Sequence, residues 1–283
     1  MHTYPDCIPC ILRASAGGAR LTGAPDPVTW LIVTQGARLA ASWDRLLPPI
    51  LLGAEVGRLL RQVLRAADPY LAEKRAANAA ALSRYPRWKD EVARAPDPLF
   101  HALQLAAAGN SLDLGLHARL DGTEVDAAAA VPFGRNDYAA FCRQLDGARA
   151  VLYLADNAGE IVLDRILIEE LVGRGKRVTV AVRGSPTLND ATADDAEAVG
   201  LGTIAEVITT GSDVPGVFLD ECSAAFRRRF RSADLILSKG MGNFEGLSQT
   251  EAPLFFLFQA KCYPVAQEAG VPAGSLVLLQ QHG

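Results

Sequence analysis

The stretch from Ala150 to Glu160, AVLYLADNAGE, determines how the rest of the chain is interpreted. Its first five residues form a short, continuous apolar run of the kind found in strands that are buried on both faces. A polar turn follows, and a helix is predicted from about Ile161 to Gly173. A buried strand that leads through a turn into a helix is the first part of a βαβ unit, in which the next strand runs parallel to the first.

The same alternation of strand and helix continues towards the C-terminus. A second helix is predicted from Pro215 to about Arg231. Further strands are predicted at Arg177–Val182, Glu206–Thr210, Leu235–Ser238, Pro253–Phe258 and Ser275–Leu279. We therefore expect an α/β fold with a Rossmann-like, three-layer parallel sheet in residues 147–283.

The chain before residue 147 has a different pattern. Apolar residues recur at three- and four-residue spacing in Trp30–Trp43 and Ile50–Ala66, and Ala-rich stretches with high helix propensity include Ala102–Ala108. Residues 1–146 are therefore predicted to form an all-helical domain or cap. Since no low-complexity linker separates the two parts, we expect them to pack closely.

Composition restricts the class of protein. Of the 283 residues, 49% are apolar and 21% are charged, which is typical of a folded globular protein. The formal net charge of −4 argues against a surface that binds nucleic acid. Residues 1–10 do not resemble a secretory signal, and the most apolar run is too short to span a bilayer. The odd number of cysteines, five, is typical of reduced thiols. We expect a cytoplasmic protein with no membrane partner, and the sequence does not indicate an oligomeric state.

Polar residues gather after four successive predicted strands, where an open parallel sheet binds its ligands. These segments are Asp156–Glu160, Arg183–Pro186 leading to Asn189 and Asp190, Gly211–Asp213 with Ser212, and Lys239–Glu245 with Gly240 and Asn243. Helix capping is the alternative explanation for Asn157, Asp190 and Asp213. Capping, however, requires neither an acid directly before Asn157 nor a glycine-rich turn that begins with a lysine.

Carboxylate and amide oxygens without a nearby histidine suit Mg²⁺ or Mn²⁺ better than zinc. None of the four histidines falls in these segments. Such a cation takes phosphate oxygens readily, and a lysine on a glycine-rich turn, as at Lys239, favours a phosphate beside it. The sequence contains no P-loop, no G-x-G-x-x-G after a strand, no Asp-x-Asp phosphatase motif and no G-x-S-x-G motif.

These segments resemble the damage-control phosphatase family, which was long classified as a domain of unknown function. The resemblance rests on Asp156–Glu160 with Asp164, Pro186–Asp190, Gly211–Gly216, Lys239–Glu245, Cys7–Cys10, Asp68–Tyr70 with Lys74, Gly109–Asp113, and Lys261 with Cys262. It covers nearly the whole chain, and the Cys-x-x-Cys and Lys-Cys pairs are similar to those of the prokaryotic branch.

The resemblance implies a metal-dependent phosphatase that acts on small phosphorylated metabolites, such as sugar phosphates or damaged intermediates, with Mn²⁺, Mg²⁺, Co²⁺ or Ni²⁺ as cofactor. It implies that Asp156, Asn157 and Asp190 bind the metal. Asp156, Glu160 and Lys239 are the expected catalytic residues. The expected substrate contacts are Asn110, Asp113, Glu160, Arg183, Ser212, Lys239, Gly240, Asn243 and Lys261. Either Asp156 or Glu160 is expected to orient the attacking water or accept its proton.

Two other functions stay open. Cys7, Cys10 and Cys262 could form a separate thiolate site, which would make the protein a thiol-dependent metal-binding or redox-sensing protein. A carboxyl methyltransferase is the weaker alternative, suggested by the description of one relative as an acidic-residue methyltransferase. The glycine-rich turn expected for an adenosyl cofactor is missing after the first predicted strand.

Overall fold

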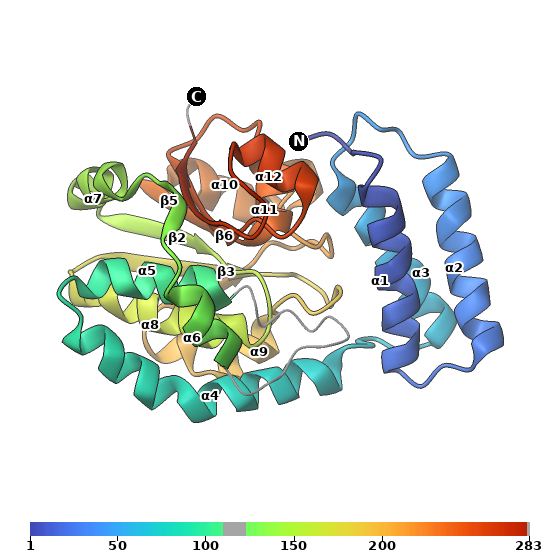
Figure 1. Cartoon of the computed structure of the whole chain (residues 1–283), viewed down its shortest axis with the longest axis horizontal. Coiled ribbons are helices and arrows are strands. Elements are labelled where there is room, and N and C mark those ends of the chain that lie inside the picture. The colour runs from blue at the N-terminus through green and yellow to red at the C-terminus, as the bar shows by residue number, and fades with distance from the viewer. Residues whose placement is uncertain (110–122, 282–283) are drawn as a thin grey trace.

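The computed structural model describes residues 1–109 and 123–281 (Figure 1). The predicted substrate contacts Asn110 and Asp113 lie outside these ranges. The helices of the first half are α1 (Cys7–Leu21), α2 (Asp26–Ala41), α3 (Pro49–Leu64), α4 (Leu71–Arg94), α5 (Pro98–Ala108), α6 (Thr123–Ala129) and α7 (Tyr138–Gly147). Those of the second half are α8 (Glu160–Gly173), α9 (Ala193–Ala198), α10 (Ala224–Ser232), α11 (Gly240–Leu247) and α12 (Tyr263–Ala269).

One seven-stranded sheet runs through the molecule. Its strands are β1 (Phe133–Asn136), β2 (Ala150–Leu154), β3 (Arg177–Val182), β4 (Glu206–Thr209), β5 (Leu235–Lys239), β6 (Leu254–Gln259) and β7 (Leu276–Gln280), in the order β1-β7-β6-β5-β2-β3-β4. From β2 the chain builds outward through β3 to β4, and it then returns to add β5 and β6 on the other side of β2. The direction of strand addition therefore reverses between β2 and β5.

The expectation of a wholly parallel sheet is correct for β4, β3, β2, β5 and β6 and wrong at the other edge. Strand β7 pairs antiparallel with β6, so that Gln259 lies opposite Leu276, and β1 is parallel to β7. The connection through α12 stays at one end of the sheet, because Ala260 N donates to Ser275 O at 2.9 Å. The chain therefore enters β7 at the end where it left β6, which forces the opposite direction.

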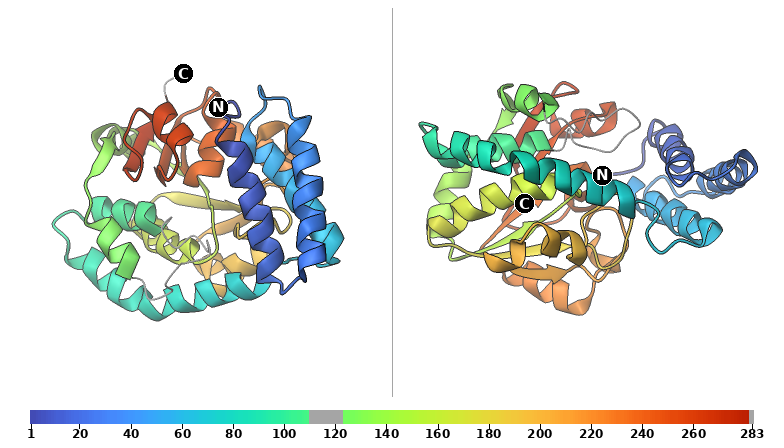
Figure 2. Two further views of the ribbon diagram at one scale, coloured as in Figure 1. Left: turned by 45° about the vertical axis from the view of Figure 1, so that its right-hand side comes forward. Right: turned by 90° about the horizontal axis from the view of Figure 1, so that it is seen from below.

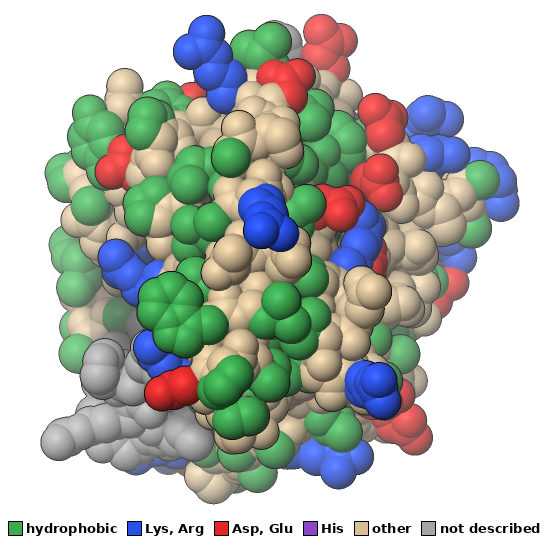
Figure 3. Space-filling view, turned by 90° about the vertical axis from the view of Figure 1, so that its right-hand side faces the viewer, with side chains coloured by type: hydrophobic (Ala, Val, Ile, Leu, Met, Phe, Trp, Pro, Cys, Tyr) green, Lys and Arg blue, Asp and Glu red, His purple; other side chains and the backbone are tan. Residues whose placement is uncertain are grey.

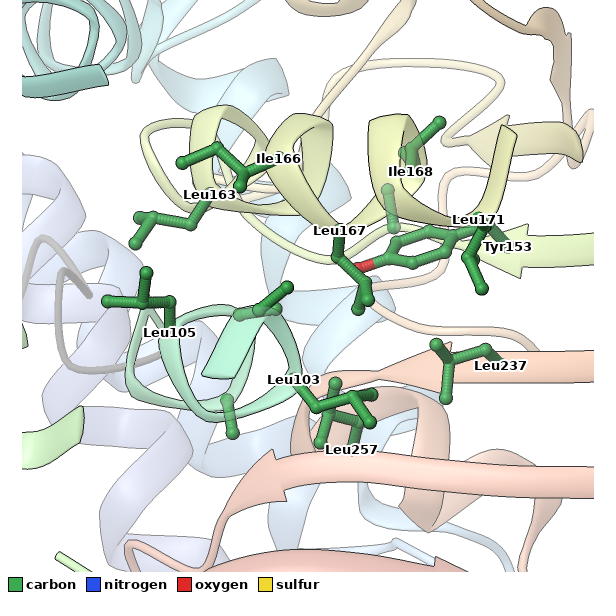
Figure 4. Close-up of a cluster of buried hydrophobic side chains, with 14 of the residues drawn as sticks. Leu103, Leu105, Tyr153, Leu163, Ile166, Leu167, Ile168, Leu171, Leu237 and Leu257 are labelled. Carbon is green, nitrogen blue, oxygen red and sulfur yellow. The ribbon is translucent and has the colours of Figure 1, made fainter. Parts of the chain in front are cut away.

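Both faces of the sheet are covered by helices. Alternate residues of a strand point to opposite faces, and accordingly Tyr153 packs in one hydrophobic cluster and Leu152 in the other. The first cluster joins the sheet to α4, α5 and α8, and the second joins it to α10, α11 and α12. Figure 4 shows the part of the first cluster between α5, α8 and the sheet. The predicted three layers are thus present.

The helices of the first half divide into two groups. Helices α1, α2 and α3 form a bundle beside the sheet, as Figure 1 and the view from below in Figure 2 show. The outward face of this side carries hydrophobic side chains interspersed with charged ones (Figure 3). Helices α4 and α5 instead pack on α8, and β1 joins the sheet. The expectation that residues 1–146 are all-helical is wrong, because this part contains β1, which pairs with β7 at the edge of the sheet. The division at residue 146 stays a prediction.

Two segments of the second half also differ from the predicted secondary structure. The helix expected from Pro215 begins at Ala224, because Gly216 has a φ of +119° and its backbone lies against Gly242 of α11. The glycine-rich segment after β5, expected as a turn, is helix α11. Within the described ranges, none of the helices is long and apolar enough to cross a membrane.

Candidate active site

A cleft of about 270 Å³ opens at the carboxyl ends of β2, β3, β5 and β6. It lies where the direction of strand addition reverses, which is the usual ligand site of an open α/β sheet. Helices α1 and α3 of the bundle form its opposite wall, through residues such as Ile11 and Ile50. Of the residues predicted from the sequence, those that line this cleft are Cys7, Cys10, Asp156, Asn157, Asp190, Lys261 and Cys262.

Backbone hydrogen bonds join the loop after β2 to the loop after β3. Asn157 and Asp190 form an isolated antiparallel bridge, in which Ala158 N donates to Asn189 O at 2.9 Å. On the other side of the bridge, Ala191 N donates to Asp156 O at 2.8 Å. These bonds bring the three predicted metal ligands to the same edge of the cleft.

The chemistry of these residues fits a hard divalent cation. Asp156 and Asp190 supply carboxylate oxygens and Asn157 supplies an amide, and all three side chains are buried. Burial, and then the nearby carboxylates of Glu160 and Asp190, raise the pKa of Asp156 well above its usual value. A cation would offset this concentration of negative charge. Among the described residues no three His, Cys, Asp or Glu side chains form a complete metal-binding group, so water and substrate would supply the other ligands.

Gly240 fits closely against the same carboxylate. Its φ is +80°, and a Cβ atom built on it would lie 1.9 Å from Asp156 Oδ2. The absence of a side chain at Gly240 therefore leaves room for the carboxylate of Asp156 at the start of α11.

Arg183 lies behind the cleft and holds its acids. The side chain is 1% exposed; its Nε donates to Asp190 Oδ2 at 2.5 Å, and its Nη2 donates to Asn243 Oδ1 at 3.2 Å. The same Nη2 is 3.6 Å from Asp156 Oδ1. Asn243 in turn donates to Lys239 O at 2.7 Å. In this structure Arg183 and Asn243 thus orient the predicted metal ligands, and their predicted contact with substrate stays a prediction.

Lys239 is also directed away from the cleft. Its buried Nζ donates to Glu160 Oε1 at 2.5 Å and to Asp164 Oδ1 at 2.6 Å, and Tyr153 donates to the same Asp164 oxygen at 2.7 Å. Although burial lowers the pKa of Lys239, the two carboxylates raise it above its usual value. For the carboxyl of Asp164 burial has the opposite sign: it raises the pKa to about 6, although the charge of Lys239 acts to lower it. The predicted roles of Lys239 and Glu160 towards substrate remain predictions.

Ser212 belongs to the turn after β4. Its Oγ accepts from Val214 N at 3.2 Å, and the side chain is 7% exposed. The neighbouring Asp213, which the sequence analysis considered as a helix cap, instead pairs with Arg58 and Arg61 of α3. Its carboxylate connects the bundle to the sheet.

Three of the five cysteines, Cys7, Cys10 and Cys262, line the cleft. Burial raises the pKa of Cys7 to about 11 and also raises the pKa of Cys262, so both are neutral thiols near neutral pH. Neutral thiols are poor nucleophiles and must lose a proton to bind a metal. The thiolate site of Cys7, Cys10 and Cys262 stays a prediction.

The fold and the cleft define an α/β protein whose carboxylates gather at the carboxyl edge of its sheet beneath a helical bundle. Comparison with known proteins identifies the family. The family model described as "Damage-control phosphatase ARMT1-like domain" matches residues 3–277. The chain therefore belongs to the damage-control phosphatase ARMT1-like family.

Individual relatives are similar over almost their whole length. An uncharacterized protein of Methanocaldococcus jannaschii is 34% identical over 98% of this chain and 95% of the relative. A damage-control phosphatase of Archaeoglobus fulgidus is 32% identical over 98% of both chains. The crystal structure of a DUF89 family protein from Pyrococcus horikoshii covers 100% of both chains with a TM-score of 0.90 and 28% identity.

Proposed function

We propose that the protein is a metal-dependent phosphomonoester hydrolase that acts on small phosphorylated metabolites. The observation that carries this proposal is the meeting of Asp156, Asn157 and Asp190 at one edge of a 270 Å³ cleft. Membership of a family that includes proteins named damage-control phosphatase supports it. The reversal of strand addition between β2 and β5 also agrees with a Rossmann-like sheet, which binds ligands at this point.

A bound Mn²⁺, Mg²⁺, Co²⁺ or Ni²⁺ would polarise a phosphoryl oxygen and offset its charge. Asp156, Asn157 and Asp190 would hold the cation. Arg183 keeps the carboxylate of Asp190 in place by its hydrogen bond. Lys261 lines the cleft, which supports a role in binding the phosphate, where its charge would stabilise the equatorial oxygens during transfer.

The geometry favours Asp156 over Glu160 as the residue that orients the attacking water. Asp156 lines the cleft, whereas Glu160 is 1% exposed and accepts a hydrogen bond from Lys239. Glu160 also lies 3.4 Å from Asn157 Nδ2, so it supports the metal ligand from behind. We assign Glu160 and Lys239 to positioning this loop.

The test measures phosphate release from a panel of sugar phosphates and an aryl phosphate, with each of the four cations or with chelator. We expect turnover that chelator abolishes, and a loss of at least about 100-fold in Asp190→Asn, because the variant removes a charged ligand and the ion pair of that ligand with Arg183. Asp90→Asn, which changes an exposed carboxylate in an i,i+4 pair with Arg94, is the control. Full activity of Asp190→Asn in chelator would refute the proposal.

A further inference from the structure

Three polar side chains lie buried outside the cleft, beside the loops that carry the predicted metal ligands. Lys74 and Asn78 occupy one face of α4, four residues apart, and Asp195 lies in α9. They are 1%, 3% and 4% exposed. Buried polar groups are costly unless they are paired, and here each of the three is paired.

Asn78 holds the loop after β2. Its Oδ1 accepts from Gly159 N at 2.7 Å. The first amides of a helix have no partner within the helix, and this bond pairs the amide just before α8. The loop also packs closely on α4, since a Cβ atom built on Gly159 would lie 3.0 Å from Ala77 Cβ. Asn78 therefore fixes the segment between Asn157 and Glu160.

Asp195 holds the loop after β3. Its Oδ2 accepts from Thr192 N at 2.9 Å and from Thr192 Oγ1 at 2.7 Å, two residues after Asp190. Its other oxygen, Oδ1, accepts from Asn78 Nδ2 at 2.9 Å. One carboxylate thus connects the loop of Asp190, directly, to the loop of Asn157, through Asn78.

Lys74 completes the network. Its Nζ lies 2.8 Å from Asp195 Oδ2 and 3.0 Å from Asp68 Oδ2, so its charge compensates two carboxylates that would otherwise be buried without a cation. Asp68 also accepts from Tyr70 N at 2.9 Å at the start of α4. The network is anchored to the helix and does not depend on the cleft.

We propose that Lys74, Asn78 and Asp195 are positioning residues that fix the separation of the two ligand loops and thereby set the affinity of the cleft for a divalent cation. None of them lines the cleft. The inference rests on the proposed function, because it assigns a role towards the same cation. Residues that orient metal ligands from behind typically change metal affinity by about 10- to 100-fold when removed.

The test compares Asn78→Ala with Tyr85→Phe. Tyr85 also lies on α4 and donates to Glu169 Oε1 of α8 at 2.5 Å. Tyr85→Phe therefore removes this one hydrogen bond from α4 to the α/β part, whereas Asn78→Ala removes two, those with Gly159 N and Asp195 Oδ1, and only Asn78 touches a ligand loop. Mn²⁺ dissociation constants are measured by titration with detection of free Mn²⁺ by electron paramagnetic resonance, and the Tm of each variant shows that it is folded. A second, milder variant, Thr192→Val, removes the bonds that the hydroxyl makes to Asp195, with its Oδ2 and with its backbone in the capping box, and keeps the bond from Thr192 N to Asp195 Oδ2.

We expect Asn78→Ala to raise the Mn²⁺ dissociation constant at least about tenfold and Thr192→Val to raise it less, while Tyr85→Phe stays within about twofold. At saturating Mn²⁺, kcat of Asn78→Ala should recover towards the wild-type value, because only the affinity is changed. Equal effects of Asn78→Ala and Tyr85→Phe, or unchanged affinity in folded Asn78→Ala and Thr192→Val, would overturn the inference alone. A wild-type protein that binds none of Mn²⁺, Mg²⁺, Co²⁺ and Ni²⁺ would overturn the proposed function together with the inference; if it binds another of the four instead of Mn²⁺, the same comparison of variants is made with that cation.

Discussion

At the scale of single residues, the site depends on a close approach between a backbone and a carboxylate. Gly240→Ala should abolish most activity and destabilise the fold by about 2 kcal/mol or more, since the new Cβ would meet Asp156 Oδ2 at 1.9 Å in a backbone conformation that favours glycine. Phosphate release and the midpoint of urea unfolding measure the two effects.

The matched control is Gly17→Ala in α1, where an added Cβ meets no atom within 4 Å. An alanine inside a helix is favoured over glycine, so this variant should be neutral or more stable by up to about 1 kcal/mol. Wild-type activity in Gly240→Ala would show that the loop of Asp156 can move without consequence, and the assignment of Asp156 would then be wrong.

Residues of the site were predictable where position in the chain was enough. Asp156 and Asn157 lie in the loop after β2 and Asp190 in the loop after β3, and the carboxyl ends of parallel strands meet at one edge. The direction of a side chain was not predictable, so Lys239 and Arg183 were expected in the cleft although their charges pair with buried acids. Asn78 and Asp195 gave no signal, because a polar residue in a helix looks like part of a solvated face until its partner is known.

At the scale of elements, the sequence predicted the strands from β2 to β6 well and the edge formed by β7 and β1 poorly. Strands β2 and β3 are apolar runs with the expected bounds, because both are covered on two faces. Strand β1 has the sequence FGRN and one buried residue, so no periodicity identifies it. The direction of β7 depends on the end of the sheet to which the connection through α12 returns the chain. The residues of β7 itself do not encode that position.

Helix α11 shows packing that overrides helix propensity. Three glycines make it a poor helix by propensity, yet Gly242 and Gly246 lie where added Cβ atoms would come within 2.7 Å of Pro215 O and 2.1 Å of Val217 O. Gly246→Ala should therefore destabilise the protein by about 2 kcal/mol or more, although alanine is the better helix former. Equilibrium unfolding in urea measures the change.

Gly57→Ala in α3 is the comparison for this prediction. The nearest atom to its added Cβ would be Thr187 Oγ1 at 3.6 Å, an ordinary contact, so helix propensity should decide and stability should hold or rise. If both alanines stabilised the protein, close packing between α11 and the segment 215–217 would not explain the glycines.

At the scale of the whole molecule, the bundle and the sheet form the two walls of the cleft, and Asp213 connects them. Arg58 Nη2 and Arg61 Nη2 each lie 2.6 Å from a different oxygen of Asp213, and Arg61 Nη1 donates to Pro186 O at 2.7 Å. Pro186 begins the loop that ends at Asp190. A change in this contact should therefore affect both the position of the bundle and the site.

Asp213→Asn should lower kcat/KM several-fold and reduce the free energy of unfolding at pH 7 by about 1 kcal/mol, the value of a partly exposed ion pair. The hydrogen bonds from Arg58, and then those from Arg61, hold the pKa of Asp213 below its usual value. A carboxyl whose pKa is lower in the folded state stabilises the fold above its unfolded pKa and loses that effect as pH falls through the folded pKa. The stability difference between wild type and variant should thus be full at pH 7 and shrink below about pH 4.

Asp90→Asn serves again as the control, since its pair with Arg94 is exposed and lies within one helix. It should leave activity unchanged and stability within about 0.5 kcal/mol at every pH. A loss of stability in Asp213→Asn without any change in kcat/KM would mean that the ion pairs hold the bundle but do not shape the cleft. If Asp213→Asn acts only by shifting the bundle relative to the sheet, the loss of kcat/KM at pH 7 should appear chiefly in KM. A substrate in the cleft would contact both walls, whereas the predicted metal ligands all belong to the sheet wall.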